Sequence, residues 1–159
     1  MNSIRIQNRQ RRHRIDRPAL RRLGQAILQC AARRAPAWDW RSIDVLLVDH
    51  AGIAPINAAA FGHEGPTDVI TLPYEAIPGE PSGATAEIVL NVERAWQQGG
   101  AAAHGADREL ALYLAHACDH LRGHDDATPA GRRSMRRREW RWLKQTGIPR
   151  LFKDASCAT

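Results

Sequence analysis

The segment SIDVLLVDH (42–50) constrains the fold more than any other part of the chain. It is rich in branched apolar residues and nearly continuous in its centre, as a strand in the interior of a sheet requires. Further strands are expected at 3–8, where apolar and polar residues alternate, and at 67–74 and 87–95. The sequence therefore predicts a small β-sheet.

Helical periodicity is clearest in DRELALYLAHACDHLRG (107–123), which carries an apolar stripe and ends in a glycine. The stripe consists of Leu110, Leu114, Ala117 and Leu121. Further helices are expected at 18–34, 51–62 and 129–147, the last opening with a Thr-Pro cap signal. Strands and helices together predict a layered α+β or α/β fold.

The length of 159 residues fits one domain, so we predict a single domain over 1–159, with fraying at 148–159. No apolar run approaches the roughly 20 residues of a membrane helix, and the basic N-terminus lacks the apolar core of a secretory signal. The three cysteines form no CxxC pair, which fits a reducing cytosol. We therefore expect a cytoplasmic protein that does not bind membranes.

Charge is segregated along the chain. The net charge is +9 over 1–34, −10 over 35–130 and +7 over 131–159. Of the 23 basic residues 21 are arginine, whose guanidinium group pairs bidentately with phosphate. The basic ends favour a nucleic-acid partner and the acidic centre favours a bound cation. Solvated basic helix faces are the alternative that charge alone leaves open.

Three of the seven histidines fall within nine positions: His116, His120 and His124. His116 and His120 are four residues apart on a predicted helix, so their rings share one face. The chain can turn back after this helix and bring Asp125 or Asp126 to the same place. The spacing predicts a metal site of two imidazoles and a carboxylate. Partly buried structural histidines beside a solvated turn are the alternative.

Two residues between His116 and His120 limit the kinds of metal site that this segment can form. Ala117 follows the first histidine, where a zinc peptidase of the HExxH kind needs its glutamate base, so the peptidase class is disfavoured. Cys118 lies about 200° around the helix from His116 and is expected in the core rather than at a metal.

Three segments match the pattern of a known family. PTDVITLPY (66–74) is similar to P-T-D-V-L-S-F-P, AEIVLNVERA (86–95) to G-D-I-V-I-S, and HACDHLRGHDD (116–126) to H-G-x-L-H-L-x-G-Y-D-H. Downstream, Met135, Glu139, Leu143 and Gly147 match an M-x3-E helix and its closing glycine. From about 42 to 147 the chain thus resembles the YbeY endoribonucleases, which mature bacterial ribosomal RNA.

The resemblance implies hydrolysis of single-stranded RNA by a metal-activated water, with zinc the usual metal. The family's ligands stand at the first, fifth and eleventh positions of the histidine motif, which are His116, His120 and Asp126 here. A carboxylate as third ligand suits zinc and also admits manganese or iron. His124, at the family's tyrosine position, is the alternative third ligand. Asp125 is expected to orient a ligand as a hydrogen-bond acceptor.

The chain also departs from the family. Phe61 stands where the family has a basic residue thought to contact RNA, and Arg94 and Arg122 are the candidates to replace its charge. Asp119 replaces a leucine of the histidine motif.

We expect an α+β fold, a small mixed β-sheet packed with helices, with the metal site at the end of a central helix. The expected function is a zinc-dependent endoribonuclease acting on small-subunit ribosomal RNA, with the ribosomal subunit and its proteins as partners. Arg136, Arg137 and Arg138 of the basic last helix are expected to contact RNA. The alternatives are a non-catalytic, metal-stabilised ribosome-assembly or RNA-binding factor and a metal hydrolase of another substrate.

Overall fold

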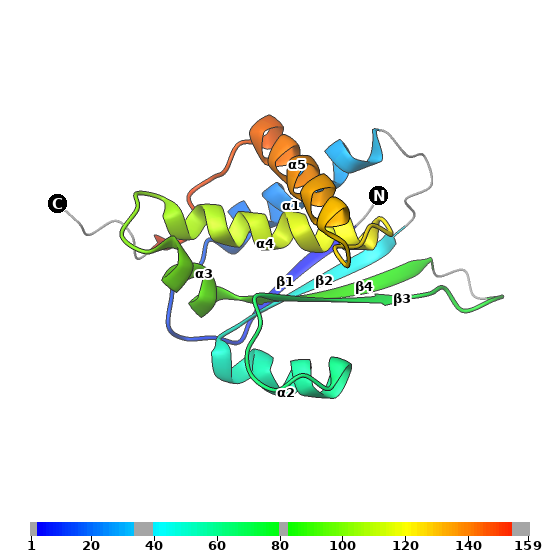
Figure 1. Ribbon diagram of the computed structural model, residues 1–159, viewed down its shortest axis with the longest axis horizontal. Coiled ribbons are helices and arrows are strands. Elements are labelled where there is room, and N and C mark those ends of the chain that lie inside the picture. Colours follow the sequence, from blue (N-terminus) through cyan, green and yellow to red (C-terminus); the bar gives the residue numbers. More distant parts are fainter. Residues whose placement is uncertain (1–2, 34–39, 80–82, 154–159) are drawn as a thin grey trace.

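A computed structural model of the protein describes residues 3–33, 40–79 and 83–153. Strands and helices mix along the chain, as expected of an α+β fold (Figure 1). In chain order the elements are β1 (Ser3–Asn8), α1 (Arg17–Ala32), β2 (Trp40–Val48), α2 (His50–Phe61), β3 (Val69–Tyr74), β4 (Ala84–Asn91), α3 (Val92–Gly99), α4 (Gly105–Leu121) and α5 (Pro129–Thr146).

The four strands form one mixed sheet in the order β1-β2-β4-β3. The first three strands are parallel, and β3 runs antiparallel to β4 at the edge. In register, Ile43 of β2 lies between Ile4 of β1 and Ala86 of β4, and all three side chains are buried. The near-continuous apolar run of β2 thus lies inside the sheet, which confirms the prediction from its composition.

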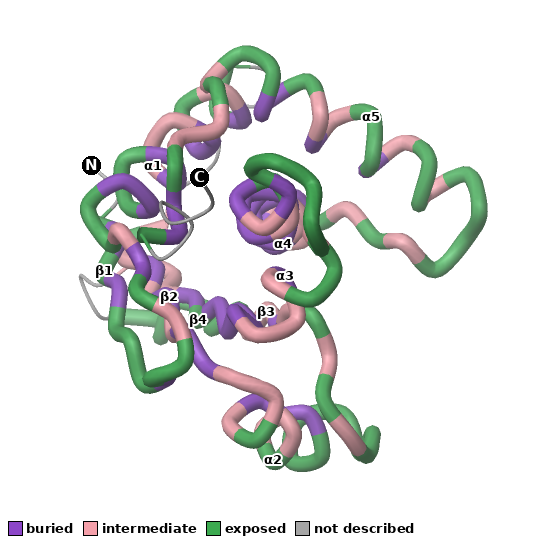
Figure 2. The backbone as a smooth tube through the Cα atoms, turned by 90° about the vertical axis from the view of Figure 1, so that its left-hand side faces the viewer, coloured by how far each residue is buried: buried purple, intermediate pink, exposed green. Residues whose placement is uncertain are grey.

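The helices cover the two faces of the sheet unequally. α1, α4 and α5 lie on one face, while α2 lies alone on the other (Figure 1). Figure 2 shows α4 in the middle of the larger layer, enclosed by the sheet, α1 and α5. All four residues of its predicted stripe are buried, at 0–7% exposure. In the described ranges, none of the helices is both long and apolar enough to cross a membrane.

The strand predicted over 87–95 is wrong in its second half. β4 ends at Asn91, and α3 begins at the next residue. The side chain of Asn91 caps this helix by accepting a hydrogen bond from the backbone N–H of Arg94 at 3.0 Å. An asparagine followed by an acidic first-turn residue was the signal for a helix start, and the apolar run before it obscured that signal.

The C-terminal segment is anchored where fraying was expected. Leu151 and Phe152 are fully buried, and their backbone N–H groups donate to Oδ1 of Asp107 at 2.7 and 2.9 Å. Fraying is therefore wrong for these residues, because a buried carboxylate at the start of α4 holds them. The remainder of the expected tail, 154–159, lies outside the described residues.

Candidate metal centre

The C-terminal part of α4 carries two histidine rings in contact. His116 and His120 are one helical turn apart, and their rings meet edge to face with centroids 4.5 Å apart. Their Nε2 atoms are 3.0 Å apart. Each side chain is a little more than one-quarter exposed, so the pair lies at the surface end of an otherwise buried helix.

The loop after α4 brings a carboxylate to this pair. Gly123 has a φ of 83°, in the left-handed region that glycine adopts without strain, and it turns the chain back. Oδ2 of Asp126 then lies 3.6 Å from Nε2 of His116, and Oδ1 lies 3.7 Å from Nε2 of His120. The structure brings the three predicted ligands together as a group that could hold a metal ion.

The far nitrogen of each ring is held by an acceptor. Nδ1 of His116 donates to Oε1 of Glu139 on α5 at 2.7 Å, and Nδ1 of His120 donates to the backbone carbonyl of His124 at 3.1 Å. With the protons on Nδ1, both Nε2 lone pairs point to the space shared with Asp126. Tetrahedral zinc with bonds of 2.0–2.2 Å separates its ligand atoms by ~3.3 Å, and the observed separations lie around that value.

Glu139 also sets the protonation of His116. Burial by itself lowers the pKa of this imidazole. The hydrogen bond and the charge of Glu139, helped by the charges of Asp126 and Asp119, outweigh burial and raise the pKa above its ordinary value. Without a metal the ring therefore holds its proton more tightly than a free histidine.

His124 and Asp125 lie close to the cluster but point elsewhere. Nδ1 of His124 is 2.9 Å from Oδ1 of the fully buried Asp119, so its ring faces that carboxylate while its carbonyl holds His120. The carboxylate of Asp125 accepts from the N–H of Ala127 at 3.1 Å. The orienting contact that we expected from Asp125 is made to His116 by Glu139 instead. The buried acid lies 23 residues away in sequence, and only the fold brings it to the ring.

Cys118 belongs to the core, as its position on α4 predicts. It is 1% exposed, and burial raises the pKa of its thiol to about 12. A thiol with such a pKa is protonated at neutral pH and is a poor metal ligand.

Comparison with known proteins identifies the family. Residues 5–147 match the family described as "Endoribonuclease YbeY". The chain belongs to the YbeY family. Two relatives carry that same name: one from Rhodopirellula baltica, 38% identical over 128 residues, and one from Moorella thermoacetica, 33% identical over 132 residues. These alignments cover 79% and 78% of this chain, and 63% and 85% of the relatives.

A solved structure has a similar fold. The solution structure of TM1509 from Thermotoga maritima superposes with a TM-score of 0.60 at 19% identity. The superposition covers 92% of this chain and 89% of that protein. At this identity the likeness concerns the fold alone.

In this YbeY chain a basic groove adjoins the cluster along α5. A cavity of about 460 Å³ contains His116, Asp126, Glu139 and Met135 together with four arginines. We call these four the arginine groove: Arg132, Arg133, Arg136 and Arg137. The sequence prediction missed the first two, although they lie one helical turn before the others. Its third arginine, Arg138, instead donates from Nε to both carboxylate oxygens of Asp119, at 2.8 and 3.1 Å.

Arg94 and Arg122, the two arginines expected to supply the charge that Phe61 lacks, make their contacts away from the histidine pair. Arg94 donates to the carbonyl of Pro66 at 3.3 Å, and Arg122 donates to the carbonyl of Ala31 at the end of α1. Neither lines a described cavity that contains His116. The arginines that share a cavity with His116 and Asp126 are those of the arginine groove.

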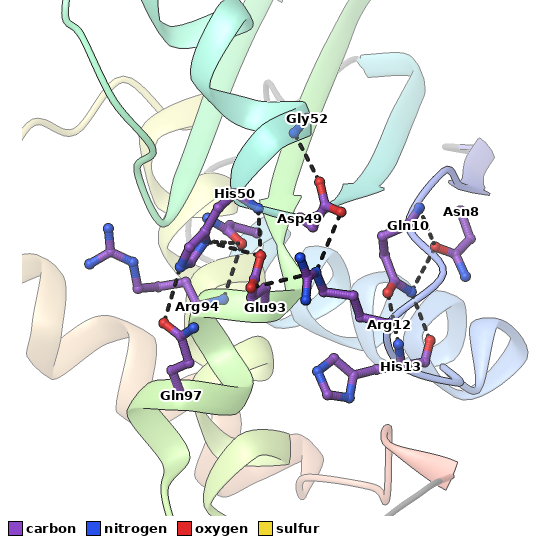
Figure 3. A network of polar contacts seen from close by, with 11 residues as sticks. Asn8, Gln10, Arg12, His13, Asp49, His50, Gly52, Glu93, Arg94 and Gln97 are labelled. Atoms are coloured by element: carbon purple, nitrogen blue, oxygen red, sulfur yellow. Dashed lines mark hydrogen bonds and ion pairs between the residues drawn. The ribbon is translucent and has the colours of Figure 1, made fainter.

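A second cluster of histidine and carboxylates is satisfied internally (Figure 3). The ring nitrogens of His50 contact the side-chain oxygens of Asn91 at 3.2 Å and Gln97 at 3.0 Å, and its backbone N–H donates to Glu93. Arg12 lies 3.5 Å from the same glutamate. These contacts hold the start of α2 against α3. Among the described residues, only the cluster at the end of α4 groups three side chains that could hold a metal ion.

Proposed function

We propose that this YbeY protein is a metal-dependent endoribonuclease that cleaves single-stranded RNA, with His116, His120 and Asp126 as the metal ligands. The best support is the arrangement of the candidate ligand atoms. The Nε2 atoms of both histidines and the carboxylate of Asp126 lie close together, and each Nδ1 atom is hydrogen-bonded to an acceptor on the other side of its ring. Two imidazoles and one carboxylate are a ligand set that would hold a zinc ion. A divalent ion held there would supply Lewis-acid chemistry, acidifying a water and polarising a phosphoryl oxygen.

The protein's own residues orient the ligands and bind the substrate. Glu139 keeps the His116 ring in the tautomer that presents Nε2, and the carbonyl of His124 does the same for His120. The arginine groove shares one cavity with His116 and Asp126, so a phosphate bound by its guanidinium groups lies beside the ligands. The same groups stabilise the extra negative charge that develops as the phosphodiester is attacked.

The substrate and the setting are inferred from the family. The relatives are named endoribonucleases, and the segregated arginines of this chain fit a polyanionic partner. We infer action on small-subunit ribosomal RNA in the cytoplasm, with the ribosomal subunit and its proteins as partners and zinc as the resident metal.

The second candidate function is a non-catalytic assembly factor that keeps a metal for stability. The exposed Phe61 favours it, because this aromatic ring stands where the family has a basic residue. The arginine groove opposes it, because it places four cations beside the cluster.

Cleavage of a single-stranded ribosomal RNA fragment, with bound metal quantified, separates the two functions. We expect the parent to cut and to carry one metal, and His120→Ala to lose both. His104→Asn is the matched control, because His104 lies at the opposite end of α4 and asparagine tolerates its φ of 58°. A parent that carries metal and binds RNA without cutting it supports the assembly factor and contradicts the endoribonuclease.

A further inference from the structure

The histidine pair lines a second cavity whose chemistry differs from that of the arginine groove. This cavity of about 350 Å³ contains both histidine rings, Phe61 at the end of α2, and four residues of the edge strand β3. The strand residues are Val69, Ile70, Thr71 and Pro73. Among the described residues that line it, none is an arginine, lysine, aspartate or glutamate.

Phe61 is unusual among the large apolar residues of the chain because 51% of it is exposed. It is the last residue of α2, and Gly62 with a φ of 68° turns the chain away directly after it. Tyr74 and Ile77 are the other exposed large apolar residues in the described part of the chain, and neither lines this cavity. Phe61 therefore offers an exposed aromatic ring in the cavity that His116 and His120 line.

We propose that this cavity binds one unpaired nucleobase stacked on Phe61, and that the phosphate of the same nucleotide lies at the cluster of His116, His120 and Asp126. The proposal rests on the proposed function and adds a subsite to it. Every base has an apolar face that stacks on aromatic rings, and proteins recognise single-stranded RNA in this way. The hydroxyl of Thr71 and the outward-facing backbone groups of the edge strand can bond to the polar edge of the base.

The two cavities suit different parts of a nucleotide, one its base and the other its phosphate. His116 lines both, so the two cavities adjoin at this ring. The arginine groove is lined by four arginines that can pair with a phosphate, whereas the residues that line the Phe61 cavity include no arginine or lysine. A base in the Phe61 cavity and its phosphates along the groove match this division.

A thermodynamic cycle that combines protein variants with RNA variants tests the nucleobase subsite. The probes are single-stranded RNA decamers with cleavage-resistant linkages, one intact and the others with a single abasic nucleotide at successive positions. Their dissociation constants are measured by fluorescence anisotropy for the metal-loaded parent, Phe61→Ala and Phe61→Trp. Ile77→Ala is the matched control, because Ile77 is 61% exposed but lies outside the cavity.

We expect Phe61→Ala to weaken binding of the intact RNA at least fivefold, the lower limit for loss of one stacked base. One abasic position should weaken binding to the parent equally and have no further effect on Phe61→Ala, because both changes remove the same contact. Phe61→Trp should bind like the parent, and Ile77→Ala should be unchanged.

Unchanged binding by Phe61→Ala would overturn the proposal. So would a result in which, at every abasic position, the loss of affinity from base removal adds fully to the loss from Phe61→Ala. Binding by the parent that ignores base removal would also overturn it, and would point to a ligand along β3 that is not a base. In each of these cases a parent that still cuts RNA leaves the proposed function intact. A parent that neither binds nor cuts single-stranded RNA overturns both.

Discussion

Replacement of Glu139 by glutamine tests whether its hydrogen bond to Nδ1 of His116 prepares the Nε2 atom of that ring to bind a metal. Glu139 is 2% exposed, and its Oε1 atom lies 2.7 Å from Nδ1 of His116. Hydrogen bonds to charged groups contribute ~1.5–3 kcal/mol and neutral ones ~0.5–1.5 kcal/mol, so Glu139→Gln costs ~1 kcal/mol from this contact alone. Glutamine can also present its NH₂ group to Nδ1, which moves the ring proton to Nε2 and blocks coordination.

The two effects together predict about 10- to 100-fold weaker zinc binding, the range seen when such supporting residues are changed. The assay is a zinc titration in competition with a chromophoric chelator, with circular dichroism to check folding. Glu93→Gln is the matched control, because Glu93 contacts His50 rather than the candidate ligands (Figure 3). If folded Glu139→Gln binds zinc within about threefold of the parent, the contact does not prepare His116 for coordination, and the argument is wrong.

Four further predictions follow from the charges near the cluster. Changing Arg136 and Arg137 together to glutamine should reduce the slope of log K against log salt for RNA by ~1.4, since each phosphate contact on a single strand contributes ~0.7; an unchanged slope would remove both from the binding surface. Since the pKa of His116 is raised above 6.5, its contribution to the stability of the metal-free protein should be fully present below pH 6.5 and be lost as pH rises through the folded value. For the same reason, apparent zinc affinity should fall up to about tenfold per unit as pH drops below that raised pKa, and chelator competition from pH 5.5 to 8 would contradict this if affinity were flat. Asp119→Leu should lower the free energy of unfolding by ~1–3 kcal/mol, because Arg138 loses a fully buried partner; urea unfolding measures this, and equal stability would show that the pair contributes nothing.

The parts of the site that are local in sequence could be predicted from it. The spacing of His116 and His120 places both rings on one helix face, and Gly123 provides the turn that returns Asp126. Helical periodicity and glycine conformation act over a few residues, so a single sequence reveals them.

The parts that depend on packing could not be predicted in the same way. Glu139 reaches His116 because α5 crosses α4, and no periodicity within either helix specifies that crossing. Phe61 and β3 meet the histidine pair only in the folded chain. The roles of Asp119 and His124 were hidden for the same reason, since their contact makes sense only beside Arg138.

The placement of the candidate ligands on two kinds of backbone has a kinetic consequence. His116 and His120 belong to α4, the most enclosed helix, whose amide protons should be among the slowest in the protein to exchange with deuterium. Asp126 belongs to a short loop at 122–128, which can open without disturbing the helix. Metal exchange should then follow local opening of that loop, so its rate should stay nearly constant in denaturant concentrations too low to unfold the protein globally.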